Sequence, residues 1–175
     1  MNARAVSLLA LAVLATAAFV VWTVPAMPER VATHFGAGNL ANAWMSREGY
    51  RIYMLAFAVA FPLLIALAVG GLPRLFPGAA DIPNRDYWLA GERRSAALAY
   101  LGRQACRLGA LAALLGAGVH ACIIAANLAQ APRLPPLPFV ALLSVFFLAL
   151  LSWMFSVYRF FARPGRGRPA RARRA

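Results

Sequence analysis

Four long apolar runs dominate the chain, and polar residues are concentrated in the segments between them. The runs cover residues 5–24, 52–72, 108–128 and 137–161; none contains Asp, Glu or Lys, and Arg159 is the only Arg inside them. A helix of about 20 apolar residues spans the hydrocarbon layer of a membrane. In lipid, each backbone N–H must be bonded within its own segment, which favours helices over open strands. The pattern therefore predicts an all-α, polytopic membrane protein with four transmembrane helices over residues 1–161.

The composition excludes an ordinary soluble domain. Hydrophobic residues make up 62% of the 175 residues and charged residues 13%, which is outside the usual soluble range. The first run also resembles a secretory signal, with a small-residue cleavage site at Ala15 to Ala17. Its apolar stretch is longer than that of a typical signal, so we expect an uncleaved anchor.

The charges predict the orientation. Every one of the 18 basic residues is Arg, and basic residues beside a span resist translocation. Arg is concentrated in the 72–107 connection and in the tail from Arg159 onward, whereas residues 25–51 and 129–136 carry few. We expect both termini in the cytoplasm of a bacterium, the cytoplasmic membrane as the location, and a basic, disordered cytoplasmic tail over residues 162–175.

The net charge of +13 raises the question of partners. A nucleic-acid-binding tail is one interpretation, but the Arg run directly follows a span and lacks interleaved aromatic residues. We therefore expect the lipid bilayer and its anionic headgroups as partners, and no nucleic acid.

The connection between the second and third spans is predicted to contain an interfacial amphipathic helix. Asp86 is a candidate N-cap. On a helical wheel, Ala97, Leu101 and Ala105 share an apolar face that is expected to lie in lipid, with Arg103 roughly opposite. The alternative is a docking surface for a cytoplasmic partner.

Two features are expected to shape the middle spans. Pro62 should bend the second span, and Gly70 to Pro73 should end it. The third span is rich in small residues that permit close helix contact. We expect these residues to pack inside the bundle, with homo-oligomerisation or a membrane partner as the alternative.

Candidate chemistry is sparse. All five acids lie in connections, so the sequence predicts no catalytic site, no enzyme activity and no cofactor. His120 and Asn127 are the polar candidates inside a span. His120 is predicted to form an interhelical hydrogen bond and lies where it could meet His34. Cys122 points about 200° around the helix from His120, so no metal site is expected.

The two cysteines, Cys106 and Cys122, are expected to be buried free thiols.

The loop over residues 27–47 is the most distinctive segment. Pro28 fixes the exit from the first span, Gly36, Gly38 and Asn39 permit a tight reversal, and Trp44 returns the chain to the interface. Such turn chemistry and aromatic anchoring indicate a structured loop.

This loop resembles a known family. Pro28 to Val31, Thr33-His34-Phe35, the following Gly-rich residues and Trp44-Met45-Ser46-Arg47 resemble domain-of-unknown-function family 1648 (DUF1648). That domain occurs at the N-terminus of SdpI-type bacterial immunity proteins. Residues 82–89 also resemble a segment of short members. The resemblance covers roughly residues 5–128, and it departs at Asn42, where an acid is often found.

The resemblance implies a set of loop-defining positions and a function. The positions are Pro28, His34, Phe35, Gly38, Trp44 and Ser46. SdpI-like proteins protect cells against secreted toxins and signal from the membrane, so the expected function is envelope sensing or toxin immunity through the outer His34 loop. A small transporter or channel component is the alternative, suggested by Pro62, His120 and Asn127.

Overall fold

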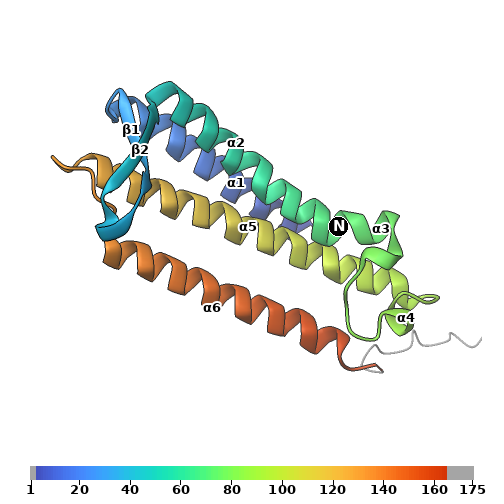
Figure 1. Ribbon diagram of the computed structural model, residues 1–175. Helices are drawn as coiled ribbons and strands as arrows, with labels where there is room; N and C mark the ends of the chain where they lie inside the picture. Colours follow the sequence, from blue (N-terminus) through green and yellow to red (C-terminus); the bar gives the residue numbers. More distant parts are fainter. Residues whose placement is uncertain (1–2, 165–175) are drawn as a thin grey trace, which may run out of the picture.

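The computed structural model describes residues 3–164 and contains long helices with one β-hairpin. The long helices lie side by side, the hairpin sits at one end of the bundle, and two short helices lie at the other end (Figure 1). The elements are α1 (Ala3–Thr23), β1 (Arg30–Phe35), β2 (Ala41–Ser46), α2 (Arg47–Ala66), α3 (Leu72–Leu75), α4 (Arg85–Trp88), α5 (Arg93–Asn127) and α6 (Pro136–Phe161). Most of the predicted basic tail, residues 165–175, lies outside the described residues.

The four predicted spans are confirmed. Within the described chain, the helices long and apolar enough to cross a membrane cover Ala3–Ala26, Arg47–Leu75, Arg93–Asn127 and Pro136–Phe161. Three of them contain a predicted apolar run entirely, and Arg93–Asn127 contains the run 108–128 except for its last residue. The protein is therefore an all-α, multi-pass membrane protein.

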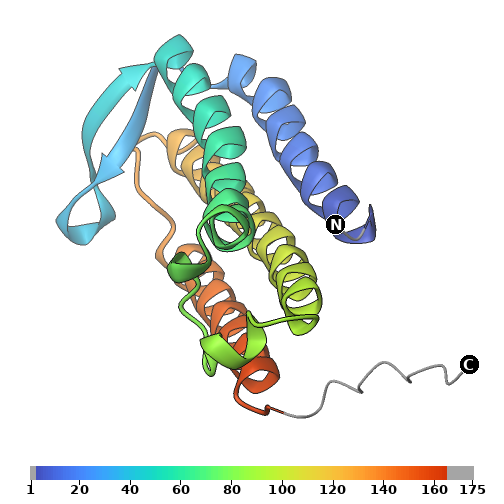
Figure 2. The same cartoon turned by 90° about the vertical axis from the view of Figure 1, so that its right-hand side faces the viewer.

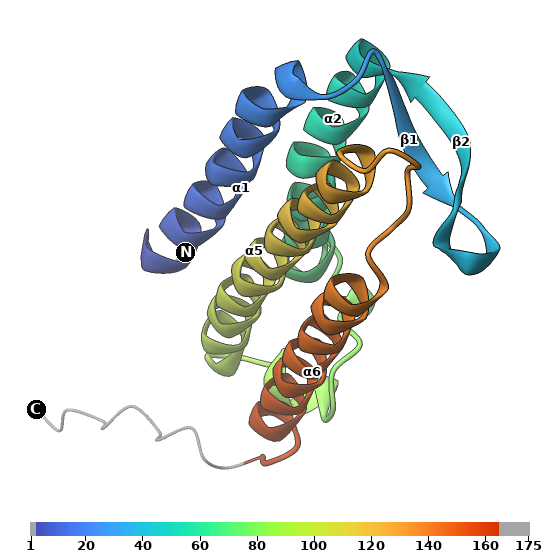
Figure 3. The ribbon, with the colours of Figure 1, turned by 90° about the vertical axis from the view of Figure 1, so that its left-hand side faces the viewer.

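Helix α5 is the centre of the bundle, because it contacts α1, α2 and α6. The views from the two ends show α1 and α2 on one side of α5, and α6 on the other (Figures 2 and 3). In α6, Phe161 is the buried residue. Most of the α6 surface is left for contact with lipid.

Small residues allow α2 and α5 to approach closely. A Cβ added at Gly109 of α5 would lie 2.8 Å from the carbonyl oxygen of Pro62. A Cβ added at Gly70 would lie 2.8 Å from Cβ of Ala105. Ala112 and Ala113 are also buried, so the expected packing inside the bundle is confirmed at these positions.

The predicted end of the second span at Gly70 to Pro73 is wrong. Helix α2 continues through Pro62, passes into a π-helical turn at Leu67–Gly71, and joins α3. The N–H of Leu72 bonds to the carbonyl of Leu67, five residues back. Because backbone groups in lipid need internal partners, the wider turn keeps the glycines hydrogen-bonded where a break would expose them.

The connection between the second and third spans also differs from its prediction. Asp86 does not cap a long helix: it lies inside the four-residue α4, which Asn84 precedes. The segment from Arg93 onward is continuous with the third span. Ala97 and Leu101 pack with Trp88 and Phe161, so the apolar face expected in lipid is covered by protein instead.

The cysteine prediction is confirmed, since Cys106 and Cys122 are both free and buried.

Candidate functional site

The predicted loop is an antiparallel β-hairpin. Arg30 pairs with Ser46 and Ala32 with Trp44, and the register shifts around His34. At the tip, Gly38 has φ +70° and Asn39 has φ +60°, a left-handed conformation that glycine and asparagine adopt most readily. The N–H of Gly36 donates to the carbonyl of Leu40 at 2.9 Å and closes the turn. The sequence predicted the reversal but not the strand pairing.

Asn127 anchors the hairpin to the helical bundle. Its Oδ1 accepts from the N–H of Ala32 at 2.8 Å, and its Nδ2 donates to the carbonyl of Ala32 at 3.0 Å. Nδ2 also donates to the carbonyl of Ile123 at 2.9 Å. The amide side chain thus bonds both backbone groups of Ala32, as a neighbouring strand would. Ala32 is fully buried, so these bonds join β1 to the end of α5 away from water.

Further backbone bonds hold the two ends of the hairpin. At the tip, Ala41 donates to the carbonyl of Pro132 at 3.1 Å, and Leu134 donates to the carbonyl of Asn39 at 2.9 Å. At the base, the Arg47 guanidinium donates to the carbonyl of Met27 at 3.0 Å. The hairpin is therefore attached to the α5–α6 connection as well as to α5 itself.

His120 is fully buried beneath the hairpin and joins three helices. Its Nε2 lies 2.8 Å from the Thr23 hydroxyl of α1, and its Nδ1 lies 2.6 Å from the Tyr50 hydroxyl of α2. The predicted interhelical hydrogen bond is present.

The bonds around His120 also indicate which ring nitrogen carries the proton. The Thr23 hydroxyl donates its single proton to the carbonyl of Phe19 at 2.7 Å, so it must accept from Nε2–H. In a neutral ring, Nδ1 then accepts from the Tyr50 hydroxyl. The ring packs at 5.0 Å against the edge of Phe19 and at 5.6 Å against Tyr50. Every polar atom of the imidazole is bonded to protein.

His34 and His120 are not brought together. His34 is exposed on the hairpin, where its Nδ1 lies 2.6 Å from Oδ1 of Asn42. A β-hairpin layer and the buried cluster of Val24, Val31 and Tyr50 occupy the space beneath. The two histidines thus belong to different environments, one exposed on the hairpin and one buried in the bundle.

The other predicted loop positions have identifiable places. Ser46 is the N-cap of α2, and its Oγ accepts from the N–H of Gly49 at 3.0 Å. Trp44 is 45% exposed on β2, Phe35 is half-buried, and Pro28 is exposed just before β1. Ser46 and Gly38 shape the hairpin, whereas Trp44 and His34 present side chains outward.

Sequence reasoning missed the partners of the two intramembrane polar residues. Thr23 and Tyr50 lie at the hairpin ends of the first and second spans. The third span runs back toward that end and therefore places His120 at the same depth. This shared depth was the sequence signal that could have paired Thr23 and Tyr50 with His120. No sequence signal indicated the hydrogen bonds of Asn127, because its partner is the backbone of Ala32.

The comparisons with known proteins concern this same region. Neither the curated proteins nor the solved structures gave a match to the chain. One family model, described as "Domain of unknown function (DUF1648)", matches residues 11–65. The match covers the hairpin, Thr23 and Tyr50, and it ends before His120 and Asn127. The resemblance indicated by the His34 loop is confirmed, since residues 11–65 of this membrane protein are similar to the DUF1648 domain.

Proposed function

We propose that this protein is a non-enzymatic binding protein of the bacterial cytoplasmic membrane, whose β-hairpin binds a polypeptide on the outer face. The observation that carries the proposal is the edge of β2 beyond Ala41, since the N–H of Ala41 at the start of the strand already donates to Pro132. Among the described residues, β1 is the strand partner of β2, and Asn42, Ala43 and Trp44 on β2 are exposed.

A free edge on a fixed hairpin suits recognition of an extended peptide. An unpaired strand edge offers N–H and C=O groups to which another chain can add as a further strand. On the opposite edge of the hairpin, the backbone of Ala32 in β1 is already hydrogen-bonded to the side chain of Asn127. Because the hairpin is already held at both ends, little conformational entropy would be lost on binding. Trp44 and His34 supply an aromatic contact and a polar contact beside the edge.

The bound polypeptide is a secreted toxin or another envelope factor. Binding of this kind would serve immunity or signalling of the SdpI type, the role that the loop resemblance suggests.

The orientation in this proposal follows from the charges. Helix α3, which contains Arg74, and the start of α5, which contains Arg93 and Arg94, lie at the end of the bundle away from the hairpin, where α1 also begins (Figure 1). At the hairpin end, Arg51 pairs with Glu48 at 2.7 Å. The Arg-rich end is assigned to the cytoplasm by the positive-inside rule, which places both termini inside.

The alternative role as a transporter or channel component gains less support. Its polar candidates were His120 and Asn127. Their side-chain polar atoms bond to protein groups, which leaves them less suited to a moving substrate.

A protection assay tests the proposal. A deletion strain carrying the gene on a plasmid is challenged with sterile-filtered culture supernatants of competing bacteria, and growth is measured. The variant H34A/W44A should lose protection, while W22A, which removes an exposed Trp from α1, should keep it. Immunoblots of membranes must show equal amounts of each protein. Full protection by H34A/W44A would count against the hairpin as the binding surface.

A further inference from the structure

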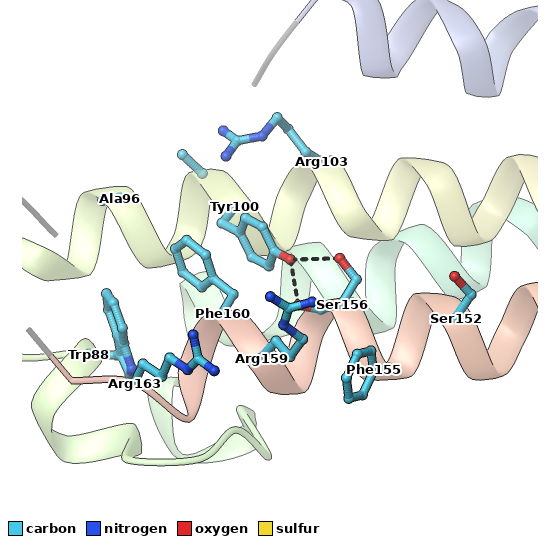
Figure 4. A pocket seen from close by; sticks show the side chains of 11 residues that line it. Trp88, Ala96, Tyr100, Arg103, Ser152, Phe155, Ser156, Arg159, Phe160 and Arg163 are labelled. Carbon is cyan, nitrogen blue, oxygen red and sulfur yellow. Dashed lines mark hydrogen bonds between the residues drawn. The ribbon is translucent and has the colours of Figure 1, made fainter. Parts of the chain in front are cut away.

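A large pocket lies between α5 and α6, at the end of the bundle away from the hairpin (Figure 4). Its volume is about 840 Å³. The lining combines arginines with aromatic and hydroxyl side chains, mainly Arg103, Arg159, Arg163, Tyr100, Ser156 and Phe160.

The positive charge of the pocket is not balanced by acids. Among the described residues, no Asp or Glu lines it. Over residues 3–164 the ion pairs are Arg51 with Glu48 and Arg85 with Asp86, and none of these four residues belongs to the lining. Arg159 packs over the Phe155 ring at 5.4 Å, and Arg103 over the Tyr100 ring at 5.6 Å. These contacts orient the guanidinium groups but leave their charge available to an anion.

The wall behind the arginines is rigid and offers hydroxyl groups. The Tyr100 hydroxyl donates to the carbonyl of Ser156 at 3.0 Å and lies 3.4 Å from its Oγ. The Tyr100 and Phe160 rings stack at 3.8 Å. Figure 4 shows Arg159 in the last turn of α6 and Arg163 just after the helix ends, both near these rings, whereas Arg103 extends from α5. Because the Tyr100 proton is committed to the Ser156 carbonyl, Ser152 and Ser156 are the hydroxyl groups of the lining that could donate to an anion held by Arg159 and Arg163.

A separate apolar depression lies on α6, one helical turn away from residues of the pocket. It has a volume of about 430 Å³ and includes Leu148 and Leu151, which lie one helical turn before Ser152 and Phe155 of the pocket. Leu148 is 67% exposed and Leu151 60%. A ligand that fits both features has a negatively charged head and an apolar chain.

We propose that this pocket binds the phosphate headgroup of an anionic membrane lipid. Arg159 and Arg163 contact the phosphate oxygens, since guanidinium groups match phosphate geometry, and Arg103 adds to the positive potential. One acyl chain lies along the Leu148 and Leu151 depression. The location fits, because the arginines follow the last apolar turns of α6, at the depth of lipid headgroups. The site is independent of the function proposed for the hairpin.

Native mass spectrometry of the full-length protein in detergent tests the proposal. The protein is titrated with phosphatidylglycerol, with phosphatidylcholine, and with inorganic phosphate. Phosphatidylglycerol should bind more tightly than phosphatidylcholine. The variant R159Q/R163Q should weaken phosphatidylglycerol binding by about 30-fold, from the contribution that each basic residue makes beside an anionic lipid. The control R94Q/R107Q removes the same charge from exposed positions of α5 and should leave the affinity unchanged.

A second variant separates the pocket from diffuse charge. Ser152 is exposed at the pocket, so S152W fills the space without changing the charge, and it should also weaken phosphatidylglycerol binding. Equal losses in R159Q/R163Q and R94Q/R107Q would overturn the proposal, as would unchanged binding by S152W. Displacement of the lipid by an equal concentration of inorganic phosphate would show a free-phosphate site and overturn the assignment to lipid.

Discussion

Truncating Asn127 tests whether one side chain holds the hairpin on the bundle. In N127A the N–H and the carbonyl of Ala32 both lose their partner, and Ala32 is fully buried. A buried donor left without a partner costs about 1–3 kcal/mol, and a lost hydrogen bond about 1 kcal/mol more. Docking of the hairpin should therefore weaken by roughly 2–4 kcal/mol.

Hydrogen–deuterium exchange of the purified protein in lipid nanodiscs measures this loss segment by segment. Where exchange follows local opening, its rate rises tenfold for each 1.4 kcal/mol or so. Amides over residues 30–46 should exchange between about 30-fold and several hundred-fold faster in N127A. The middle of α1 should keep its protection, because Asn127 makes none of its hydrogen bonds there.

The control is N42A, which removes the exposed bond between Asn42 and His34. An exposed hydrogen bond competes with water, so this change should have a small effect. Unchanged exchange over residues 30–46 in N127A, or an equal acceleration in N42A, would refute the anchoring argument.

Three further predictions concern packing, the buried histidine and the orientation. G109A should lower thermal stability in detergent by about 1–3 kcal/mol, because its new Cβ would lie 2.8 Å from a backbone carbonyl of α2; G116A, whose Cβ would lie 3.7 Å from a ring carbon, should be nearly neutral. Y50F removes the hydroxyl bonded to the buried imidazole and should lower stability by about 1–3 kcal/mol in the same assay. The control Y53F should have little effect, because Tyr53 is 56% exposed. Equal stability of the two variants would contradict the hydrogen-bond network around His120. A cysteine at Ala43 should react with an impermeant maleimide added to intact cells, while the wild type should not; labelling that requires membrane permeabilisation would reverse the orientation.

The predicted and observed structures agree best in the membrane-spanning segments, where the lipid environment constrains the backbone. Each predicted span coincides with a long apolar helix to within one residue at its end or lies inside it, because a chain in hydrocarbon has to bond its own backbone locally. The family resemblance was also readable, since the Thr-His-Phe loop and the Trp-Met-Ser-Arg segment are local in sequence. His120 was identified as a polar residue needing a partner, although its partners were not.

The features that sequence reasoning missed depend on residues far apart in the chain. The hairpin is fixed by Asn127, which lies 95 residues after Ala32. At the π-helical turn before α3, Gly70 packs closely on Ala105 of α5. The arginines at the end of α6 were assigned to topology, and the pocket that they line is formed together with residues of α5 such as Tyr100, which stacks on Phe160.

The sequence by itself determined the number of spans and the helical class. The length of a hydrophobic run is a local property, and it decides whether a segment can span the bilayer. Only the tertiary structure decided which polar groups meet. Partners of His120, Asn127 and the α6 arginines come from other helices, and their pairing depends on how the helices pack. The two proposed binding surfaces, the β2 edge and the α5–α6 pocket, therefore arise from packing rather than from any single motif.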